Sequence, residues 1–334
     1  MKKILLILTS ISIGTLFIIS AATKIYPMEP FEYQFVDIGV ATWKTTPYIA
    51  RFFIGIEFFL GMLFVFNIAL RRFTIKFAIG LLTAFIIYLS YKIYTTGNVG
   101  NCGCFGESIK MSPLEGILKN VVLIILCIFL YFNTDKNTWS PIMKMISPEL
   151  DDHFFTQKNE SLLLIVQRAI IPVLLIGSMC LGFFVYPINA TLSSRMDKST
   201  INYKVPLELM YKSTQMEKPK INLLKGKHVI AFLSLTCPHC KIAAQKIRVI
   251  HKKNPGIPFY FVLNGDKEME SVFFEDTQSQ DIPHSLFIDA GSGDWKQVAG
   301  FALPIIMYIN NSIVEKKTTG LELDQNDIEV WLKK

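Results

Sequence analysis

Long apolar stretches dominate the first half of the chain. Five segments are apolar over nearly the length of about 20 residues that a membrane-spanning helix needs. They are 4–22, 48–70, 73–94, 116–132 and 169–186. After residue 186, short apolar runs typical of strands alternate with amphipathic helical patterns. The sequence therefore predicts a multi-domain protein, with an α-helical transmembrane bundle of five helices over 1–186, a linker over 187–200 and a soluble α/β domain over 201–334.

Basic residues around these helices predict their orientation. Lys2 and Lys3 precede the first helix, and Arg71 and Arg72 lie between the second and the third. Because short cytoplasmic loops collect positive charge, this side is expected to be the cytoplasm. Five crossings then place the soluble domain outside, in the periplasm of a bacterium with a multi-pass protein in its inner membrane. Residues 1–22 also fit a cleaved signal peptide, and either alternative leaves the following loop outside.

The composition agrees with a protein that is part membrane and part soluble. The 334 residues are 51% hydrophobic and 18% charged, whereas about 25% of a typical soluble domain is charged. A disordered chain, which is poor in apolar residues, is excluded. The net charge of +7 is spread over both parts and marks the cytoplasmic side of the first. Membrane lipid is therefore an expected partner and nucleic acid is not.

Four of the six cysteines form two close pairs. Cys237 and Cys240 follow an apolar, β-prone run over 229–235 and begin an amphipathic helix, and this context favours a redox motif. Cys237 is expected at the helix N-terminus, where free N–H groups stabilise a thiolate. Pro238 suits the first helical turn. His239 adds positive charge, and Cys240 can resolve a mixed disulfide.

Other interpretations of this motif are a zinc half-site and an inert disulfide. A zinc site needs a second pair of ligands, and the histidines show no such spacing, so no metal is expected. Over about 200–334 the domain resembles the thioredoxin superfamily. The resemblance implies that Pro304 is a cis-proline facing the CxxC and that Leu303 lines the substrate groove; a proline that merely opens a strand is the alternative. The Pro-His dipeptide is similar to that of DsbA-type periplasmic oxidants.

The second pair, Cys102 and Cys104, lies in a glycine-rich loop between the third and fourth predicted helices. A disulfide between them would close only a small, strained ring, and strained disulfides are the labile ones. A Cu(I) site and coincidence are the alternatives. By the orientation above, this loop lies on the same side as the soluble domain.

These residues give the first part a family resemblance. The loop Cys-Gly-Cys-Phe-Gly at 102–106, the stretch Ser-Ala-Ala-Thr-Lys at 20–24, and Ala-Arg and Gly-Ile-Glu at 50–51 and 55–57 resemble the MauE/DoxX-like redox-associated membrane proteins. The resemblance covers about 1–132. It implies four helices with the cysteine loop before the last, and it favours retention of the first helix.

Glu57 lies within the second predicted helix, six residues after Arg51. Carboxylates inside a membrane are costly and indicate function. Glu57 and Arg51 are therefore candidates for a proton or quinone role, and a buried structural pair is the alternative. Cys127 and Cys180 stand alone in the fourth and fifth predicted helices and are expected to be small apolar fillers.

Together the two cysteine pairs predict a membrane-bound thiol–disulfide oxidoreductase that relays electrons between them. Cysteine-containing exported proteins are the expected clients, with no firmly bound cofactor and with quinone or another membrane redox protein as the electron acceptor. Three alternatives stand beside this. The relay could run in reverse to supply reductant for cytochrome or quinone-cofactor maturation, the protein could handle Cu(I), or it could be a non-catalytic membrane assembly factor.

Overall fold

The computed structural model of this protein describes most of the chain. The described residues are 2–134, 160–185, 201–212, 214, 217–287, 293–300 and 302–334. The chain divides into two compact units, Met1–Ile188 and Asn189–Lys334. The predicted linker at 187–200 and the predicted end of the fifth helix at 186 lie outside the described residues.

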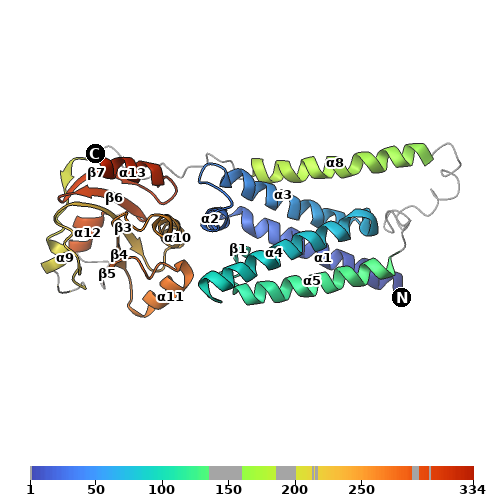
Figure 1. The fold of residues 1–334 in the computed structure, drawn as a ribbon, viewed down its shortest axis with the longest axis horizontal. Helices are drawn as coiled ribbons and strands as arrows, with labels where there is room; N and C mark the ends of the chain where they lie inside the picture. The colour runs from blue at the N-terminus through green and yellow to red at the C-terminus, as the bar shows by residue number, and fades with distance from the viewer. Residues whose placement is uncertain are drawn as a thin grey trace. The chain divides into compact units, whose positions relative to one another are not determined.

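The first unit is a bundle of helices (Figure 1). Its elements are α1 (Lys2–Ile25), α2 (Glu29–Asp37), α3 (Thr46–Val65), the π-helical turn η1 (Leu70–Thr74), α4 (Ile75–Thr96), the short strand β1 (Cys104–Glu107), α5 (Pro113–Asn133) and α8 (Glu160–Phe184). All five predicted helices are present with shifted ends, while α2 was not predicted. The second predicted helix ends five residues early because Asn67 and Ala69 adopt positive φ angles of 52° and 47°, which end a right-handed helix.

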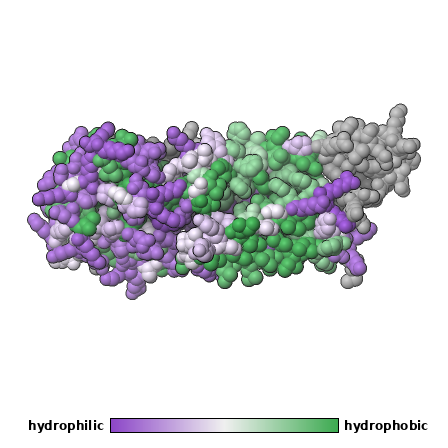
Figure 2. Space-filling model, in the orientation of Figure 1, coloured by the Kyte–Doolittle hydropathy of each residue, from purple (hydrophilic) through white to green (hydrophobic). Residues whose placement is uncertain are grey.

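Four segments of this unit are long and apolar enough to cross a membrane, judged by length and composition. They are Lys2–Ile25, Thr46–Val65, Leu70–Thr96 and Pro113–Asn133. In α8 the described apolar stretch is shorter, Ala169–Phe184. Large apolar side chains such as Ile87 and Ile125 are exposed by 65% and 59%, and Figure 2 shows hydrophobic residues over the visible face of this unit. Because a water-soluble monomer rarely exposes so much apolar surface, the chain is a multi-pass membrane protein.

Helices α1 and α3 cross at very close range. A Cβ atom on Gly14 of α1 would lie 2.7 Å from the carbonyl oxygen of Gly61 on α3, so the contact needs a residue without a side chain. Phe17 and Phe64 stack beside this crossing with ring centroids 6.0 Å apart. The buried positions of α1 recur every three or four residues and continue to Lys24. The crossing therefore aligns the end of α1 with the middle of α3.

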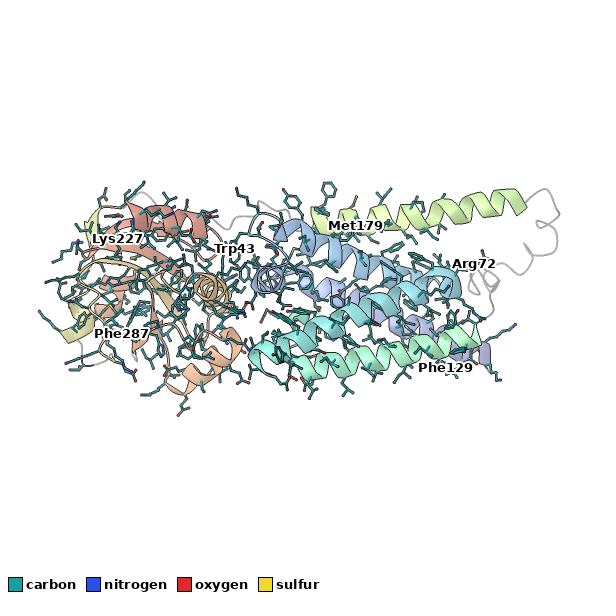
Figure 3. All side chains as sticks on the ribbon, viewed as in Figure 1. Trp43, Arg72, Phe129, Met179, Lys227 and Phe287 are labelled. Atoms are coloured by element: carbon teal, nitrogen blue, oxygen red, sulfur yellow. The ribbon has the colours of Figure 1, made fainter. Side chains whose placement is uncertain are left out.

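The two ends of the helical unit carry different residues. Figure 3 shows Arg72 near the end where α1 begins, and the neighbouring Arg71 donates from Nη1 to the carbonyl oxygen of Thr134, 3.0 Å away, just after α5. The loop with β1 lies at the other end, near α2 and the labelled Trp43 (Figures 1 and 3). The cysteine loop and the Arg71–Arg72 turn are thus on opposite sides of the bundle.

The second unit is a six-stranded sheet with helices on both faces. The strands are β2 (Tyr203–Lys204), β3 (Lys227–Ser234), β4 (Phe259–Asn264), β5 (His284–Phe287), β6 (Ile305–Asn310) and β7 (Ile313–Thr318), and the helices are α9 (Leu209–Lys212), α10 (Pro238–Lys253), α11 (Glu268–Thr277), α12 (Gly293–Ala299) and α13 (Gln325–Lys333). The strand order is β2-β7-β6-β3-β4-β5. Strands β3, β4 and β5 run parallel, while β6 is antiparallel to β3 and to β7. This topology is thioredoxin-like, as predicted; β2 and α9 were not predicted.

Strand β3 forms the centre of this sheet, and its apolar run is buried on both faces. Side chains alternate between the faces of a strand, so Phe232 packs on one face with Phe287 and Trp295. Figure 3 labels Phe287 within this unit and Lys227 at the start of β3. A strand whose central residues are buried therefore leads toward the first cysteine pair.

Candidate redox sites

The CxxC motif begins helix α10. Cys237 is the N-cap residue with extended backbone angles (φ −78°, ψ 120°), and Pro238 occupies the first helical turn. Cys237 is partly exposed, His239 is exposed and Cys240 is fully buried. A free N-terminal turn of a helix favours a negative group at this position. The motif thus presents one sulfur to solvent and hides the other.

The two thiols of this motif have opposite acidities. The pKa of Cys237 is lowered to about 6, first by a hydrogen bond from the Cys240 thiol and further by the backbone and charge of His239. The pKa of Cys240 is raised because its proton is held in that hydrogen bond and because it is buried. Near neutral pH Cys237 is therefore the thiolate, which is the nucleophilic form, and Cys240 keeps its proton.

Pro304 and Leu303 lie near the same end of β3. The Leu303–Pro304 peptide bond is cis, as the family resemblance implies. Ile305 of β6 pairs with Phe232 of β3. Pro304, just before β6, therefore lies at the same end of the sheet as the C-terminal end of β3, from which the chain continues to the CxxC motif. Leu303 is half-buried against the core of the unit. A role for these two residues in holding a client peptide stays a prediction.

The second cysteine pair lies in a tight loop around β1. The backbone N–H of Cys104 donates to the sulfur of Cys102 at 3.2 Å, and Gly103 between them has a φ of 70°. Gly116 of α5 lies directly against both sulfurs, because a Cβ atom there would be 3.0 Å from Sγ of Cys104 and 3.1 Å from Sγ of Cys102. The predicted pair is therefore close in space, packed on the first turns of α5.

The acidities of Cys102 and Cys104 also differ. The pKa of Cys104 is lowered to about 6, first by a hydrogen bond from the Cys102 thiol and then by the positive charges of Lys119 and Lys24. The pKa of Cys102 is raised by holding that proton and by burial, and its exposure is only 2%. This repeats the arrangement at the CxxC motif, with one partly exposed thiolate and one buried thiol.

A buried network of one ion pair and several hydrogen bonds contacts the cysteine loop. Nζ of Lys24 lies 2.9 Å and 2.7 Å from the two carboxylate oxygens of Glu57, and the two side chains are 3% exposed. Lys24 also donates to Oγ of Ser20 at 2.7 Å. That hydroxyl lies 2.9 Å from the carbonyl oxygen of Cys104 and 3.2 Å from Glu57, so its single proton can go to either acceptor. The network therefore links Glu57 to the backbone of the redox loop.

Arg51 does not pair with Glu57. Its Nη1 donates to Oε1 of Glu32 on α2 at 2.8 Å and to the carbonyl oxygen of Pro47. The interpretation of Arg51 and Glu57 as one buried structural pair is therefore wrong, because the last turn of α1 supplies Lys24 as the partner of Glu57 and α2 supplies Glu32 as the partner of Arg51. Each of the two α3 residues belongs to a separate ion pair.

Beside the cysteine loop lies a cavity with about 550 Å³ of empty space, some of it open to solvent. Its lining includes Cys102, Cys104, the Lys24–Glu57 pair and the side chain of Asn120. Asn120 is 1% exposed, and neither its nitrogen nor its oxygen has a hydrogen-bond partner. The cavity thus combines an acidic thiol, an ion pair and an unpaired buried amide.

Sequence reasoning missed several of these residues. Lys24 was given no role of its own, but α1 continues past it and buries it; its spacing of four from Ser20 places both on one face of a helix. Nζ of Lys119 on α5 lies 4.6 Å from the ring centroid of Phe105 in the cysteine loop. A polar Asn120 inside an apolar helix was the signal for the cavity.

The solitary cysteines differ in their surroundings. Cys127 is fully buried in the apolar core of the bundle, as expected of a small filler. Cys180 on α8 is exposed. Among the described residues neither lies in the lining of the cavity beside the cysteine loop.

The fold and these sites define a membrane-bound thiol–disulfide oxidoreductase with a thioredoxin-like unit. A family model described as "Methylamine utilisation protein MauE" matches residues 1–133, which confirms the resemblance of the helical unit. Protein TlpB of Flavobacterium psychrophilum is 30% identical over 312 residues, covering 81% of this chain and 79% of TlpB. The chain belongs to the TlpB family.

Solved structures resemble the α/β unit more distantly. A secreted Mycobacterium tuberculosis disulfide oxidoreductase homologous to Escherichia coli DsbE is 15% identical, with a TM-score of 0.27, and the match covers 33% of this chain and 83% of that one. The thioredoxin domain of a thiol-disulfide oxidoreductase from Bacteroides vulgatus is also 15% identical, with a TM-score of 0.30 and coverage of 41% and 99%.

Proposed function

We propose that this protein oxidises cysteine-containing exported proteins and passes their electrons from the Cys237–Cys240 pair to the Cys102–Cys104 pair. The observation that carries the proposal is the shared asymmetry of the two sites. In each pair one cysteine is partly exposed and has a thiol pKa of about 6. Its neighbour is a buried thiol that donates a hydrogen bond to it. Two such pairs in one chain suit consecutive exchange reactions.

The client step is a thiol–disulfide exchange. A client thiolate attacks the sulfur of Cys237 in the oxidised pair, and the Cys240 thiolate leaves and takes up a proton. The second client thiolate then attacks the first client sulfur and releases Cys237 as a thiolate. A thiol of low pKa is a good leaving group, so the lowered pKa of Cys237 favours completion of this step. The client loses two electrons and becomes a disulfide.

The second exchange returns the CxxC pair to its oxidised form. The Cys237 thiolate attacks Cys104 of the oxidised loop pair, since Cys104 is more exposed than Cys102. Cys102 leaves, and Cys240 then resolves the mixed disulfide and frees Cys104. The loop pair now holds two electrons, which go to a quinone or another membrane redox protein.

Both pairs are expected on the periplasmic side of an inner membrane. Lys2 and Lys3 begin α1, and Arg71 and Arg72 lie at the same end of the bundle. The positive-inside rule makes that end cytoplasmic. The cysteine loop at the opposite end then faces the periplasm, and an odd number of crossings brings the α/β unit there too.

Trapping in cells tests the client step. In the Cys240→Ser variant the resolving thiol is absent, so disulfide-linked adducts with exported proteins should accumulate on Cys237. Adding Cys237→Ser to this variant should abolish every adduct. Adducts that survive the double substitution, or a complete lack of adducts in Cys240→Ser cells, would refute the client step.

Redox trapping in the same cells tests the relay. In the Cys102→Ser/Cys104→Ser variant, electrons can no longer leave the CxxC pair, so Cys237 and Cys240 should accumulate as dithiols after acid quenching and alkylation. Cys180→Ser changes an exposed solitary cysteine and is the matched control. A CxxC pair that stays oxidised in the double variant would exclude the relay. If the loop pair instead reduces the CxxC pair, the protein supplies reductant.

A further inference from the structure

The cavity beside the cysteine loop has the chemistry of a ligand site. Asn120 lies inside α5, two turns from its start, with both polar side-chain atoms buried and without a partner. Nearly all buried amides in proteins are hydrogen-bonded, so this one calls for a ligand group. A carbonyl oxygen would accept from its N–H₂ group.

The cavity walls favour a flat, apolar ring. Aromatic side chains line it from three helices and the loop, namely Phe17, Phe31, Phe85, Tyr88 and Phe105. Leu16 also belongs to the lining and is 38% exposed on the apolar outer surface of α1. The cavity is thus continuous with a surface that contacts lipid, and an apolar molecule can enter from the membrane.

The cavity lining also includes the cysteine pair of the loop. Cys102 and Cys104 line the cavity together with the ion-paired Lys24 and Glu57. We infer that the cavity binds the ring of a membrane quinone, with the Asn120 amide donating to a ring carbonyl beside Cys104. This inference rests on the proposed function for the source of its electrons but not for the binding itself.

The redox step balances with these groups. The Cys104 thiolate and the Cys102 thiol give up two electrons and one proton and form a disulfide. The quinone takes up both electrons, the proton from Cys102 and one further proton to become a quinol. The second proton comes from solvent. The quinol then leaves to the membrane.

Equilibrium binding tests the inference without thiol chemistry. The full chain with Cys102→Ser and Cys104→Ser is purified in detergent, and the Kd of decylubiquinone and of menadione is measured by calorimetry. Adding Asn120→Leu removes the amide at nearly constant volume and should weaken binding roughly three- to tenfold, the loss expected for one hydrogen bond. Thermal melting of each variant verifies that it is folded.

The matched control is Asn133→Leu at the far end of α5. The Asn133 side chain is exposed and donates to the carbonyl oxygen of Phe129 at 2.9 Å, so its loss should leave the Kd unchanged within twofold. An equal Kd in the Asn120→Leu protein, no binding of either quinone, or binding abolished by a short-chain phospholipid would each overturn the inference.

This assay separates the two proposals. If quinone binds through Asn120 but the Cys102→Ser/Cys104→Ser cells keep an oxidised CxxC pair, the relay fails and the quinone site stands. If electrons reach the loop pair but no quinone binds, the relay stands and the acceptor is another membrane redox protein.

Discussion

Lys24 of α1 and Glu57 of α3 form a bidentate ion pair inside the helical unit, with Nζ at 2.9 Å and 2.7 Å from the carboxylate oxygens. Lys24 donates to the hydroxyl of Ser20, which in turn lies within hydrogen-bond distance of the backbone carbonyl of Cys104 in the cysteine loop. Desolvating two charges is costly, and the pair is favourable only while both partners remain. The stability of the bundle and the position of the redox loop therefore both depend on this pair.

Glu57→Gln should destabilise the helical unit. The substitution leaves the Lys24 ammonium buried without its counter-ion, and breaking a buried pair costs about 3–5 kcal/mol. Unfolding of the full chain in mixed micelles measures the loss. Asp327→Asn breaks the exposed Lys316–Asp327 pair and should cost at most about 1 kcal/mol. A Glu57→Gln protein as stable as the parent would show that the pair contributes nothing.

Alkylation of Cys237 should follow its lowered pKa. The thiolate forms as pH rises through about 6, so the rate of iodoacetamide labelling should rise with a midpoint near that pH, whereas an ordinary cysteine titrates near 8.5. Mass spectrometry of the Cys237 peptide gives the rate in the Cys102→Ser/Cys104→Ser background. A midpoint above 8 would contradict the hydrogen bond from Cys240 as the cause.

The same pKa shift makes the stability of the reduced α/β unit depend on pH. Cys237 loses its proton at about pH 6 in the folded protein and near 8.5 when unfolded. A lowered pKa stabilises the folded state above the unfolded value, and that contribution is lost as pH falls toward 6. Denaturant unfolding of the reduced protein between pH 6 and 8.5 should therefore show rising stability, and the Cys237→Ser variant should lack this rise.

Gly106→Ala should displace the cysteine loop. Gly106 has a φ of 58°, and a Cβ atom there would collide with the carbonyl oxygen of Thr23. An L-residue with positive φ costs roughly 1–2 kcal/mol before that collision. Cys104 should then react faster with a maleimide in the full chain. Gly80→Ala in α4 is the control, because nothing lies within 4 Å of its Cβ position; equal Cys104 reactivity in the two variants would refute the expectation.

Asn120→Leu should stabilise the protein in the absence of quinone. A buried amide without a hydrogen bond costs about 1–3 kcal/mol, and leucine fills a similar volume without that cost. The melting temperature of the purified variant should therefore rise above that of the parent. A variant less stable than the parent would mean that the amide already has a partner. A gain in stability together with weaker quinone binding is the pattern expected of a residue kept for function.

The local patterns of the sequence were enough for most of the secondary structure. The apolar run over 229–235 and the helical spacing after Cys240 predict β3 and α10 because both depend on neighbours along the chain. Two short elements, α2 and β2, gave no clear periodicity over nine and two residues. The break between α3 and α4 comes from two positive φ angles, which no apolar pattern reveals.

By itself the sequence determined the division into a membrane part and a soluble part, and it placed one cysteine pair at a helix N-terminus and another in a loop. Those features follow from solvent preference and from spacing along the chain. Only the tertiary structure decided that Lys24 pairs with Glu57 while Arg51 pairs with Glu32, and that the unpaired Asn120 lines the same cavity as Cys104. Such contacts join elements that are distant in sequence, so they depend on how the helices pack; the Lys24–Glu57 pair, for example, joins the two helices that pack closely at Gly14 and Gly61.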